Sequence, residues 1–341
     1  MHLAIAPRRL RLKRPLETAH GTIAERELLD VLVIGADGIA GAGEAAPLES
    51  YDGVALDDVR AALEDCRAIV READGRPLHQ VLADCREAAV LPQAVAALDL
   101  ALWDREGRRL RASVAALLGG KAGANVAVNA VVGATDPAAA ARAATAAAEA
   151  GHRCVKLKVG VGDDVARVAA VRAALGPAVA LRLDANGAWA TPAEAERALR
   201  ALAPFELVEE PVHGVAALRE LQAALPQTAV AMDESGVEPG AVGSGATRLV
   251  CLKLTRCGGI SGLVEAAEQA RAAGSEVFLA STFDGPLGIA GALHAAAAIE
   301  PTRPCGLATL SAFADLDLDP ALAVEDGFMR VPTGPGLGVR A

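Results

Sequence analysis

Aromatic side chains are scarce in this chain of 341 residues, where phenylalanine, tryptophan and tyrosine together make up 2% of the sequence. The chain is nevertheless 52% hydrophobic, with alanine supplying much of that share, so we expect a packed core of helices and strands rather than disorder. Basic residues number 33 against 43 acidic ones, a net charge of −10. They form no stripe interleaved with aromatics, so nucleic acid is not an expected partner.

Long hydrophobic runs are absent as well. Gly, Asn, Asp or Pro interrupts every apolar stretch well before the roughly 18 residues that a membrane helix needs, so no membrane partner is expected. The basic N-terminal stretch has no apolar core of the signal-peptide kind. The six cysteines are dispersed without a C-x-x-C pair, which predicts buried reduced thiols. A cytoplasmic location is the resulting expectation.

The first part of the chain predicts an α+β capping domain, residues 1–122. Residues 1–50 alternate apolar and polar side chains around a hairpin turn at Ala36-Asp37-Gly38. Residues 55–119 instead repeat apolar side chains at spacings of three and four, which is typical of helices. The length of the chain leaves room for one barrel beside this domain.

Residues 123–311 change to strand followed by helix, and 312–341 are expected to return to the cap. Eight strand-like runs are predicted, at 126–133, 154–160, 179–186, 205–211, 228–235, 247–254, 275–281 and 305–310. Eight such units predict an α/β fold, a modified TIM (β/α)7–8 barrel whose strands are parallel. A doubly wound open sheet is disfavoured because no glycine-rich phosphate loop follows the first strand.

Charged residues end five successive runs. Lys156 and Lys158 alternate with Val155, Leu157 and Val159, so both lysines should face the barrel interior while the apolar set faces the helices. Two adjacent ammonium groups should lower at least one lysine pKa, so that a neutral amine can act as a general base.

Three carboxylates, Asp184, Glu209 and Asp233, end the next three strands, and Lys253 ends the sixth. Carboxylates at the C-terminal ends of adjacent barrel strands would repel one another without a cation, and hard oxygen ligands favour Mg²⁺. The predicted chemistry is proton abstraction from the carbon beside a carboxylate, giving an enediolate that the metal and an ammonium group stabilise. Helix capping is the competing role for Glu210 and Glu234.

These motifs together resemble the enolase superfamily, specifically its muconate lactonizing enzyme subgroup, over nearly the whole chain. The segments that carry the likeness are GIAGAGEAAP, KLKVG, LDANGAW, VEEP, MDES and LKLTRCGGI. The resemblance implies Lys158 and Lys253, with Lys156 beside them, as catalytic lysines. It also implies Asp184, Glu209 and Asp233 as ligands of Mg²⁺, with Mn²⁺ as a substitute.

The resemblance further implies a substrate-side or outer set of residues. Two of these residues, His20 and Tyr51, belong to the cap loops. The others follow barrel strands and are Asn186, Glu234, Ser281, Asp284, Gly306 and Thr309. A small-molecule carboxylate is the implied substrate, and members of this family commonly form homo-oligomers.

The member of the subgroup is less sharply indicated. Gly306-Leu307-Ala308-Thr309-Leu310 resembles a segment of o-succinylbenzoate synthases, the dehydratases of menaquinone biosynthesis. Dipeptide epimerases carry an Asp-x-Asp pair on the eighth strand, and Asp315 and Asp317 follow that strand here, where a surface loop is also expected. Muconate cycloisomerase and N-succinylamino acid racemase are further alternatives, and Asp284 could imitate the cycloisomerase glutamate or cap a helix.

Two readings from other classes are weaker. A metal-binding scaffold without activity would be expected to lack a base or a ligand, yet all five positions are filled. A phosphate-binding barrel could use Gly258-Gly259 as an anion-binding nest, but Lys253 would then have no obvious partner.

Overall fold

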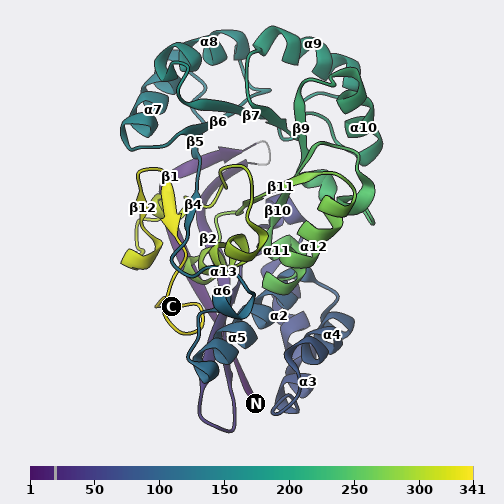
Figure 1. Ribbon diagram of the computed structural model, residues 1–341, viewed down its shortest axis with the longest axis vertical. Helices are drawn as coiled ribbons and strands as arrows, with labels where there is room; N and C mark the ends of the chain where they lie inside the picture. The colour runs from purple at the N-terminus through teal and green to yellow at the C-terminus, as the bar shows by residue number, and fades with distance from the viewer. Residues whose placement is uncertain (19–20, 341) are drawn as a thin grey trace.

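The computed structural model describes residues 1–18 and 21–340. Figure 1 shows an arc of parallel strands with helices on its outer side, and a second group of helices beside a long hairpin at the opposite end of the molecule. The α/β barrel with an N-terminal capping domain is therefore confirmed. Of the helices in the described ranges, none is long and apolar enough to cross a membrane.

The N-terminal part forms an antiparallel sheet of three strands and a group of helices. The strands are β1 (His2–Thr18), β2 (Gly21–Ile34) and β3 (Ala40–Ala45), and the helices are α1 (Glu49–Asp52), α2 (Leu56–Asp65), α3 (Arg67–Arg71), α4 (Leu78–Ala89), α5 (Pro92–Leu110) and α6 (Val114–Leu117). The predicted turn at Ala36-Asp37-Gly38 joins β2 to β3.

Alternation along β1 and β2 gives this sheet two apolar faces. Leu29, Val31 and Val33 pack with the cap helices in one core cluster. The intervening positions, such as Leu10 and Leu28, belong to a second cluster that contains the barrel residues of the α12 and α13 region. Because side chains alternate across a strand, one face of the β1–β2 hairpin packs against the cap helices and the other face packs against the barrel.

The central part forms a seven-stranded parallel sheet in the order β11-β10-β9-β8-β7-β6-β5. Its strands are β5 (Ala130–Val132), β6 (Cys154–Lys158), β7 (Ala180–Asp184), β8 (Leu207–Glu209), β9 (Ala229–Met232), β10 (Leu249–Lys253) and β11 (Glu276–Ala280). The helices are α7 (Pro137–Glu149), α8 (Asp164–Leu175), α9 (Pro192–Leu202), α10 (Val215–Ala224), α11 (Leu254–Cys257), α12 (Ile260–Ala272) and α13 (Pro286–Ile299), with short 3₁₀ turns η1 (Glu234–Val237) and η2 (Val242–Ser244) after β9.

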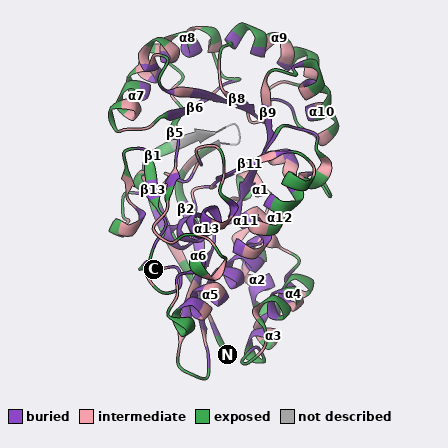
Figure 2. Cartoon of the chain, in the orientation of Figure 1, coloured by how far each residue is buried: buried purple, intermediate pink, exposed green. Residues whose placement is uncertain are grey.

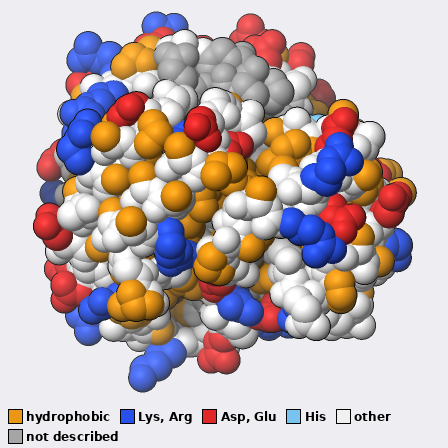
Figure 3. Space-filling model, turned by 90° about the horizontal axis from the view of Figure 1, so that it is seen from above, with side chains coloured by type: hydrophobic (Ala, Val, Ile, Leu, Met, Phe, Trp, Pro, Cys, Tyr) orange, Lys and Arg blue, Asp and Glu red, His pale blue; other side chains and the backbone are white. Residues whose placement is uncertain are grey.

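Helices α7 and α9 each begin with a proline in the first turn, preceded by a residue whose side chain accepts a hydrogen bond, as predicted. Asp136 accepts the amide of Ala139 at 2.7 Å, and Thr191 accepts that of Glu194 at 3.3 Å. The outer helices cover the strands with their buried sides and turn their exposed sides to solvent (Figure 2). On the face seen from above, acidic and basic side chains are interspersed rather than segregated (Figure 3).

Two of the eight predicted strands differ from the sequence interpretation. The run 126–133 divides at Asn129 into β4 (Asn125–Ala127) and β5. The run 305–310 is not a strand of its own: Cys305 bridges to Val128 and Gly306 bridges to Ala280, which links the two edges of the sheet. Pro304 offers no N–H for an earlier ladder bond, and the chain turns at Thr309, whose amide reaches the Leu307 carbonyl at 2.8 Å.

The chain beyond Ala312 contacts both the cap and the barrel. Phe313 bridges to Leu12 of β1, while β12 (Val324–Glu325) and β13 (Phe328–Arg330) extend a small sheet from β4. Two 3₁₀ turns, η3 (Leu310–Ala312) and η4 (Pro320–Leu322), connect these segments.

Asp99 joins the cap to the barrel at the Gly258-Gly259 turn. Its carboxylate on α5 accepts the Ile260 amide at 2.6 Å and the Ser261 amide at 3.3 Å, at the start of α12. A Cβ on Gly259 would lie 2.4 Å from that of Asp99. The amides of Gly258 and Gly259 both donate to the Leu254 carbonyl, and those of the next two residues donate to Asp99, so this turn gives no support for binding an external phosphate.

His294 of α13 is fully buried and fixes the C-terminal segment. Its Nδ1 accepts the Ala115 amide at 3.1 Å, which leaves the protonated Nε2 to donate to the Leu337 carbonyl at 3.0 Å. Burial lowers the pKa of His294 from 6.5 to about 4. The neutral ring therefore belongs to the folded state, and protonation in the unfolded chain favours unfolding.

We expect this histidine to weaken the fold on acidification. Because the pKa is lower in the folded state, its contribution is complete above pH 6.5 and is lost as the pH falls towards 4, by up to roughly 3 kcal/mol. His294→Gln can keep both hydrogen bonds without titrating, so its free energy of unfolding should fall less between pH 7.5 and 5 than that of the wild type. Urea unfolding at both pH values measures the difference, and parallel curves for the two proteins would contradict it.

Candidate active site

Five adjacent strands, β6 to β10, bring the predicted charged residues together at or just beyond their C-terminal ends. Lys158 lies directly opposite Asp184, and Asp184 directly opposite Glu209, in the registers of β6–β7 and β7–β8. Glu209 pairs with Ala231, so Asp233, two residues further, keeps the same face. Lys253 ends the next strand, β10. The order lysine, three carboxylates, lysine along the sheet follows from the order of the strands.

The interior below these residues holds small and apolar side chains and one buried arginine, Arg182, which lies over the Phe278 ring and pairs with Glu206 at 2.7 Å. A separate core cluster is formed by Leu207, Ala231, Leu249, Cys251, Phe278 and Ala280. On the outer side, Val155, Leu157 and Val159 pack with the helices, as the alternation around the two lysines predicted. Apart from Arg182 in the middle of β7, the inner charges named here lie towards the C-terminal ends of the strands, where barrel enzymes place their sites.

Lys156 bridges two of the carboxylates. Its Nζ lies 3.0 Å from Asp184 Oδ2 and 2.9 Å from Glu209 Oε2, with both acids at most 3% exposed. Burial lowers the pKa of Lys156, but Asp184 and Glu209 outweigh it, and the pKa is raised well above its usual value. The expected lowering of a lysine pKa by its neighbour is therefore wrong for Lys156, because carboxylates are its nearest partners.

Lys158 has a different environment. Its Nζ donates to the amide oxygen of Asn186 at 2.5 Å and lies 3.5 Å from Asp184 Oδ2. The side chain is 28% exposed, which makes it the most accessible of the three lysines. Asn186, with a φ of 45°, turns its amide nitrogen to Glu234 Oε1 at 2.9 Å. Glu234 therefore orients Asn186.

Lys253 is enclosed by Asp233 and the cap residue Tyr51. Its Nζ lies 2.6 Å from both Asp233 oxygens and donates to the Tyr51 hydroxyl. The ammonium also lies 4.6 Å from the centre of the Tyr51 ring, and Arg256 lies 4.2 Å from the same centre. This arrangement leaves the Lys253 side chain 7% exposed.

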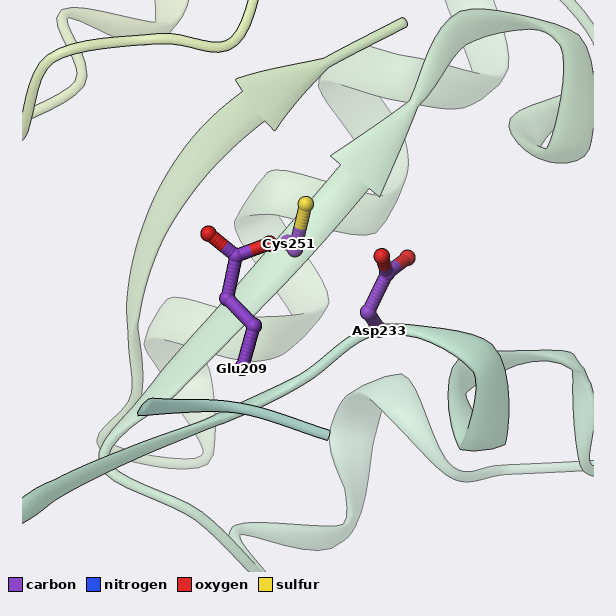
Figure 4. Close-up of side chains that lie close together, drawn as sticks. All are labelled: Glu209, Asp233 and Cys251. Carbon is purple, nitrogen blue, oxygen red and sulfur yellow. The ribbon is translucent and has the colours of Figure 1, made fainter. Parts of the chain in front are cut away.

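The carboxylates fit a hard divalent cation. Glu209, Asp233 and Cys251 each offer one ligand atom within 4.8 Å of the others (Figure 4). Burial raises the pKa of Glu209, Lys156 opposes this, and the charges of Asp184 and Asp233 raise it further. Acidic oxygens that repel one another at the ends of three neighbouring strands suit Mg²⁺, whereas the Cys251 thiol is a softer donor than Mg²⁺ prefers.

Glu210 serves the local fold rather than the site. It accepts the amides of Asp233 at 2.8 Å and Ser235 at 2.9 Å, and so holds the turn that begins η1. The competing capping role is thus found for Glu210, while Glu234 bonds to Asn186.

The remaining predicted residues divide into three groups. Ser281 and Thr309 lie together, with their hydroxyl oxygens 3.0 Å apart, and Gly306 lies beside them, bridged to Ala280. Asp284 is 1% exposed at the junction with the cap and accepts the Thr282 hydroxyl at 3.0 Å. It does not cap α13, whose first free amides go to Glu44 instead. His20 lies outside the described residues.

Asp315 is bound elsewhere. Arg11 of β1 holds it with two bonds of 2.5 and 2.9 Å, and Asp317 is exposed. The surface-loop interpretation describes both residues better than a role in holding a substrate ammonium group.

Sequence reasoning missed two arginines beside the site. Arg256 of α11 lies 3.4 Å from Asp52 and 3.6 Å from Asp233, and its place three residues after Lys253 was a usable signal. Arg26 lies on the barrel-facing side of β2, where alternation with Leu28 could have shown its direction but not its partners.

Comparison with known proteins places this chain in a family. The model of the enolase C-terminal domain-like family matches residues 138–341, and that of the mandelate racemase / muconate lactonizing enzyme N-terminal domain matches residues 1–119. The chain belongs to the enolase superfamily, in its muconate lactonizing enzyme subgroup.

Its relatives carry several activities. A hydrophobic dipeptide epimerase of Enterococcus faecalis is 32% identical over 304 residues, covering 85% of this chain and 84% of that enzyme. The o-succinylbenzoate synthase of Mycobacterium tuberculosis is 40% identical over 193 residues, 53% of this chain and 57% of that enzyme. A dipeptide epimerase structure from Enterococcus faecalis, in complex with Mg and L-Leu-L-Tyr, has a TM-score of 0.89 at 27% identity, covering 99% of this chain and 98% of that one.

Removing Lys156 should destabilise the fold. Lys156→Met would leave Asp184 and Glu209 buried without their shared ammonium, which costs about 3–5 kcal/mol for a broken buried pair. Urea unfolding in EDTA measures the loss, with Lys121→Met as the control because Lys121 is exposed. Equal stability of Lys156→Met and wild type in EDTA would show that the three groups do not depend on one another.

Proposed function

We propose that this protein is a Mg²⁺-dependent enzyme that removes the α-proton of a carboxylate substrate, with Lys158 and Lys253 flanking the reacting carbon. The observation that carries this proposal is the order along the sheet: Lys158, then Asp184, Glu209 and Asp233, then Lys253. Groups on adjacent strand ends converge on one small volume, as an enediolate-forming site requires.

The three carboxylates would hold the metal, with Mn²⁺ as a substitute. When bound, Mg²⁺ supplies positive charge that favours the enediolate over the acid. Lys158 would take the proton, since its amine is the accessible one and its near partner Asn186 is neutral. Lys253, held between Asp233 and Tyr51, would keep an ammonium beside the developing negative charge.

Within this chemistry we propose dehydration to o-succinylbenzoate. The unequal surroundings of the two lysines favour a reaction served from one face, because Lys253 is enclosed and Lys158 is open. In a syn elimination Lys158 alone can take the α-proton and return it to the departing hydroxyl, which leaves as water. The partial similarity to an o-succinylbenzoate synthase at 40% identity supports the same choice.

Dipeptide epimerisation is the second candidate. The extended similarity to the dipeptide epimerase structure favours it. One observation counts against it: Asp315, the residue considered for binding the substrate ammonium group, is already bound by Arg11. Muconate cycloisomerisation, N-succinylamino acid racemisation, homo-oligomerisation and a cytoplasmic location stay predictions.

Mg²⁺ should stabilise the folded protein. At one hundred times the dissociation constant, a ligand that binds only the folded state adds about 2.7 kcal/mol, so the melting temperature should rise with added Mg²⁺ or Mn²⁺. Glu209→Gln should lose most of this rise, whereas Glu220→Gln, a change of an exposed glutamate, should keep it. A melting temperature that is the same with and without Mg²⁺ or Mn²⁺ would contradict the proposed metal site.

Activity is tested with Mg²⁺ in D₂O on dipeptides, N-succinyl amino acids and the cyclohexadiene precursor of o-succinylbenzoate. We expect the ultraviolet absorbance of the aromatic product, with no α-deuterium in the dipeptides by NMR. Lys158→Ala should abolish the product, Lys253→Ala should lower its rate by about 10²-fold or more through lost charge stabilisation, and Lys121→Ala should leave the rate unchanged.

Other outcomes separate the candidates. Inversion and deuterium uptake in a dipeptide would replace dehydration by epimerisation. A loss of that exchange in Asp315→Asn would then assign Asp315 to the substrate ammonium group, against its contact with Arg11. No reaction of any acid in the panel would contradict the o-succinylbenzoate proposal.

A further inference from the structure

A single buried arginine joins the two loops that border the Lys253 side of the site. Arg26 of β2 is 2% exposed. Its Nη1 donates to the Pro47 carbonyl at 2.7 Å and its Nη2 to the Ala46 carbonyl at 2.9 Å, in the cap. Its Nε donates to the Phe283 carbonyl at 3.3 Å, in the barrel loop after β11. One planar guanidinium thus bonds the cap and the barrel simultaneously.

The cap side of this connection leads directly to Tyr51. Pro47 precedes Leu48, the residue before α1, and the Tyr51 amide reaches the Leu48 carbonyl at 2.7 Å. Leu48 is held further by Asp52, whose Oδ2 accepts its amide at 3.1 Å. A helix of one turn cannot fix its own position, because it has too few internal hydrogen bonds. The carbonyls that Arg26 holds therefore set where Tyr51 meets Lys253.

The barrel side leads to Ser281 and its neighbours. Phe283 has a φ of 58°, a left-handed conformation that costs a non-glycine residue of order 1–3 kcal/mol. The bond from Arg26 satisfies its carbonyl in that conformation. Two residues before it, Ser281 directly follows β11 and contacts Thr309. Movement of Phe283 would shift this hydroxyl pair.

Neutral acceptors make the connection unusual. Within residues 1–18 and 21–340, the hydrogen-bonded partners of Arg26 are three main-chain carbonyls, although Asp284, Asp52 and Glu44 lie near enough to act on its charge. A buried guanidinium that served only to balance charge would pair with a carboxylate. Here the guanidinium donates its hydrogen bonds to the backbone carbonyls of two loops. Such bonds fix the position of the loops and do not neutralise a charge.

We propose that Arg26 is a positioning residue that holds the cap loop carrying Tyr51 and the barrel loop carrying Phe283 in fixed relation over Lys253. Its catalytic consequence rests on the proposed function, but the placement of Tyr51 does not. Substituting Arg26 should release Tyr51 from Lys253 and Asp233 while the rest of the fold persists.

The chain contains one tyrosine, so incorporation of 3-fluorotyrosine gives one protein ¹⁹F resonance, that of Tyr51. In Arg26→Lys, whose ammonium cannot reach three carbonyls in two loops, we expect the resonance to move towards that of the unfolded protein at temperatures well below melting. Lys253→Met serves as the reference for a lost Tyr51 contact. Arg182→Lys is the control for loss of a buried guanidinium, because Arg182 is also buried and bonds the Pro304 carbonyl and the Glu206 carboxylate, both far from α1 in sequence.

An unchanged resonance in Arg26→Lys, with only a lower melting temperature, would show a merely structural role and overturn the proposal. If Arg26→Lys does not fold, Arg26→Gln, which buries no charge, answers the same question. With a substrate that the wild type converts, Arg26→Lys should lower kcat about tenfold or more and change KM less, since misplaced groups cost rate. Absence of any wild-type turnover would contradict the proposed function, while the resonance would still decide the role of Arg26.

Discussion

Like charges at the ends of parallel strands are the constraint on which this structure depends. Asp184 and Glu209 are directly opposite in register, and Asp233 follows on the next strand, all three almost without exposure. Burial of unpaired carboxylates is costly, so the barrel must supply cations at the same edge. Lys156 and Lys253 supply them from within the chain. The site is thus a set of charges that stabilise one another, and the proposed metal would replace some of these contacts.

The cap is attached through polar groups that end barrel elements. Glu44 of β3 accepts the amides of Leu287 and Gly288 at the start of α13, and Asp99 accepts those at the start of α12. Gly285 and Gly288 leave room for this contact, because a Cβ on either would lie within 2.9 Å of a Glu44 oxygen. Carboxylates are favoured at helix N-termini, so each attachment also compensates a buried acid. Burial nonetheless raises the pKa of Glu44 to about 7, although Arg8 lies 2.7 Å from its carboxylate and opposes this shift.

Sequence reasoning succeeded where the signal was local and periodic. The inner direction of Lys156 and Lys158 followed from alternation, and their meeting with Asp184 followed from parallel strands ending at one edge. It failed where partners were distant or a run was too long. The 305–310 run suggested a strand but contributes only Cys305 and Gly306 to the sheet. Arg26 bonds residues about 20 and 257 positions away, and no local pattern indicates such partners.

The scarcity of aromatics gives the few that remain distinct positions. Phe278 lies under the guanidinium of Arg182 inside the barrel, at 5.3 Å, and Tyr51 lies between Lys253 and Arg256. Tyr51 shares the contact between the cap and the charged strand ends with Asp52, which lies 3.4 Å from Arg256. Because Tyr51 stands on a single helical turn, the accuracy of that contact must come from outside the turn, from Asp52 and from the carbonyls that Arg26 holds. Under the proposed function, the contact between Tyr51 and Lys253 would therefore depend on hydrogen bonds made outside α1.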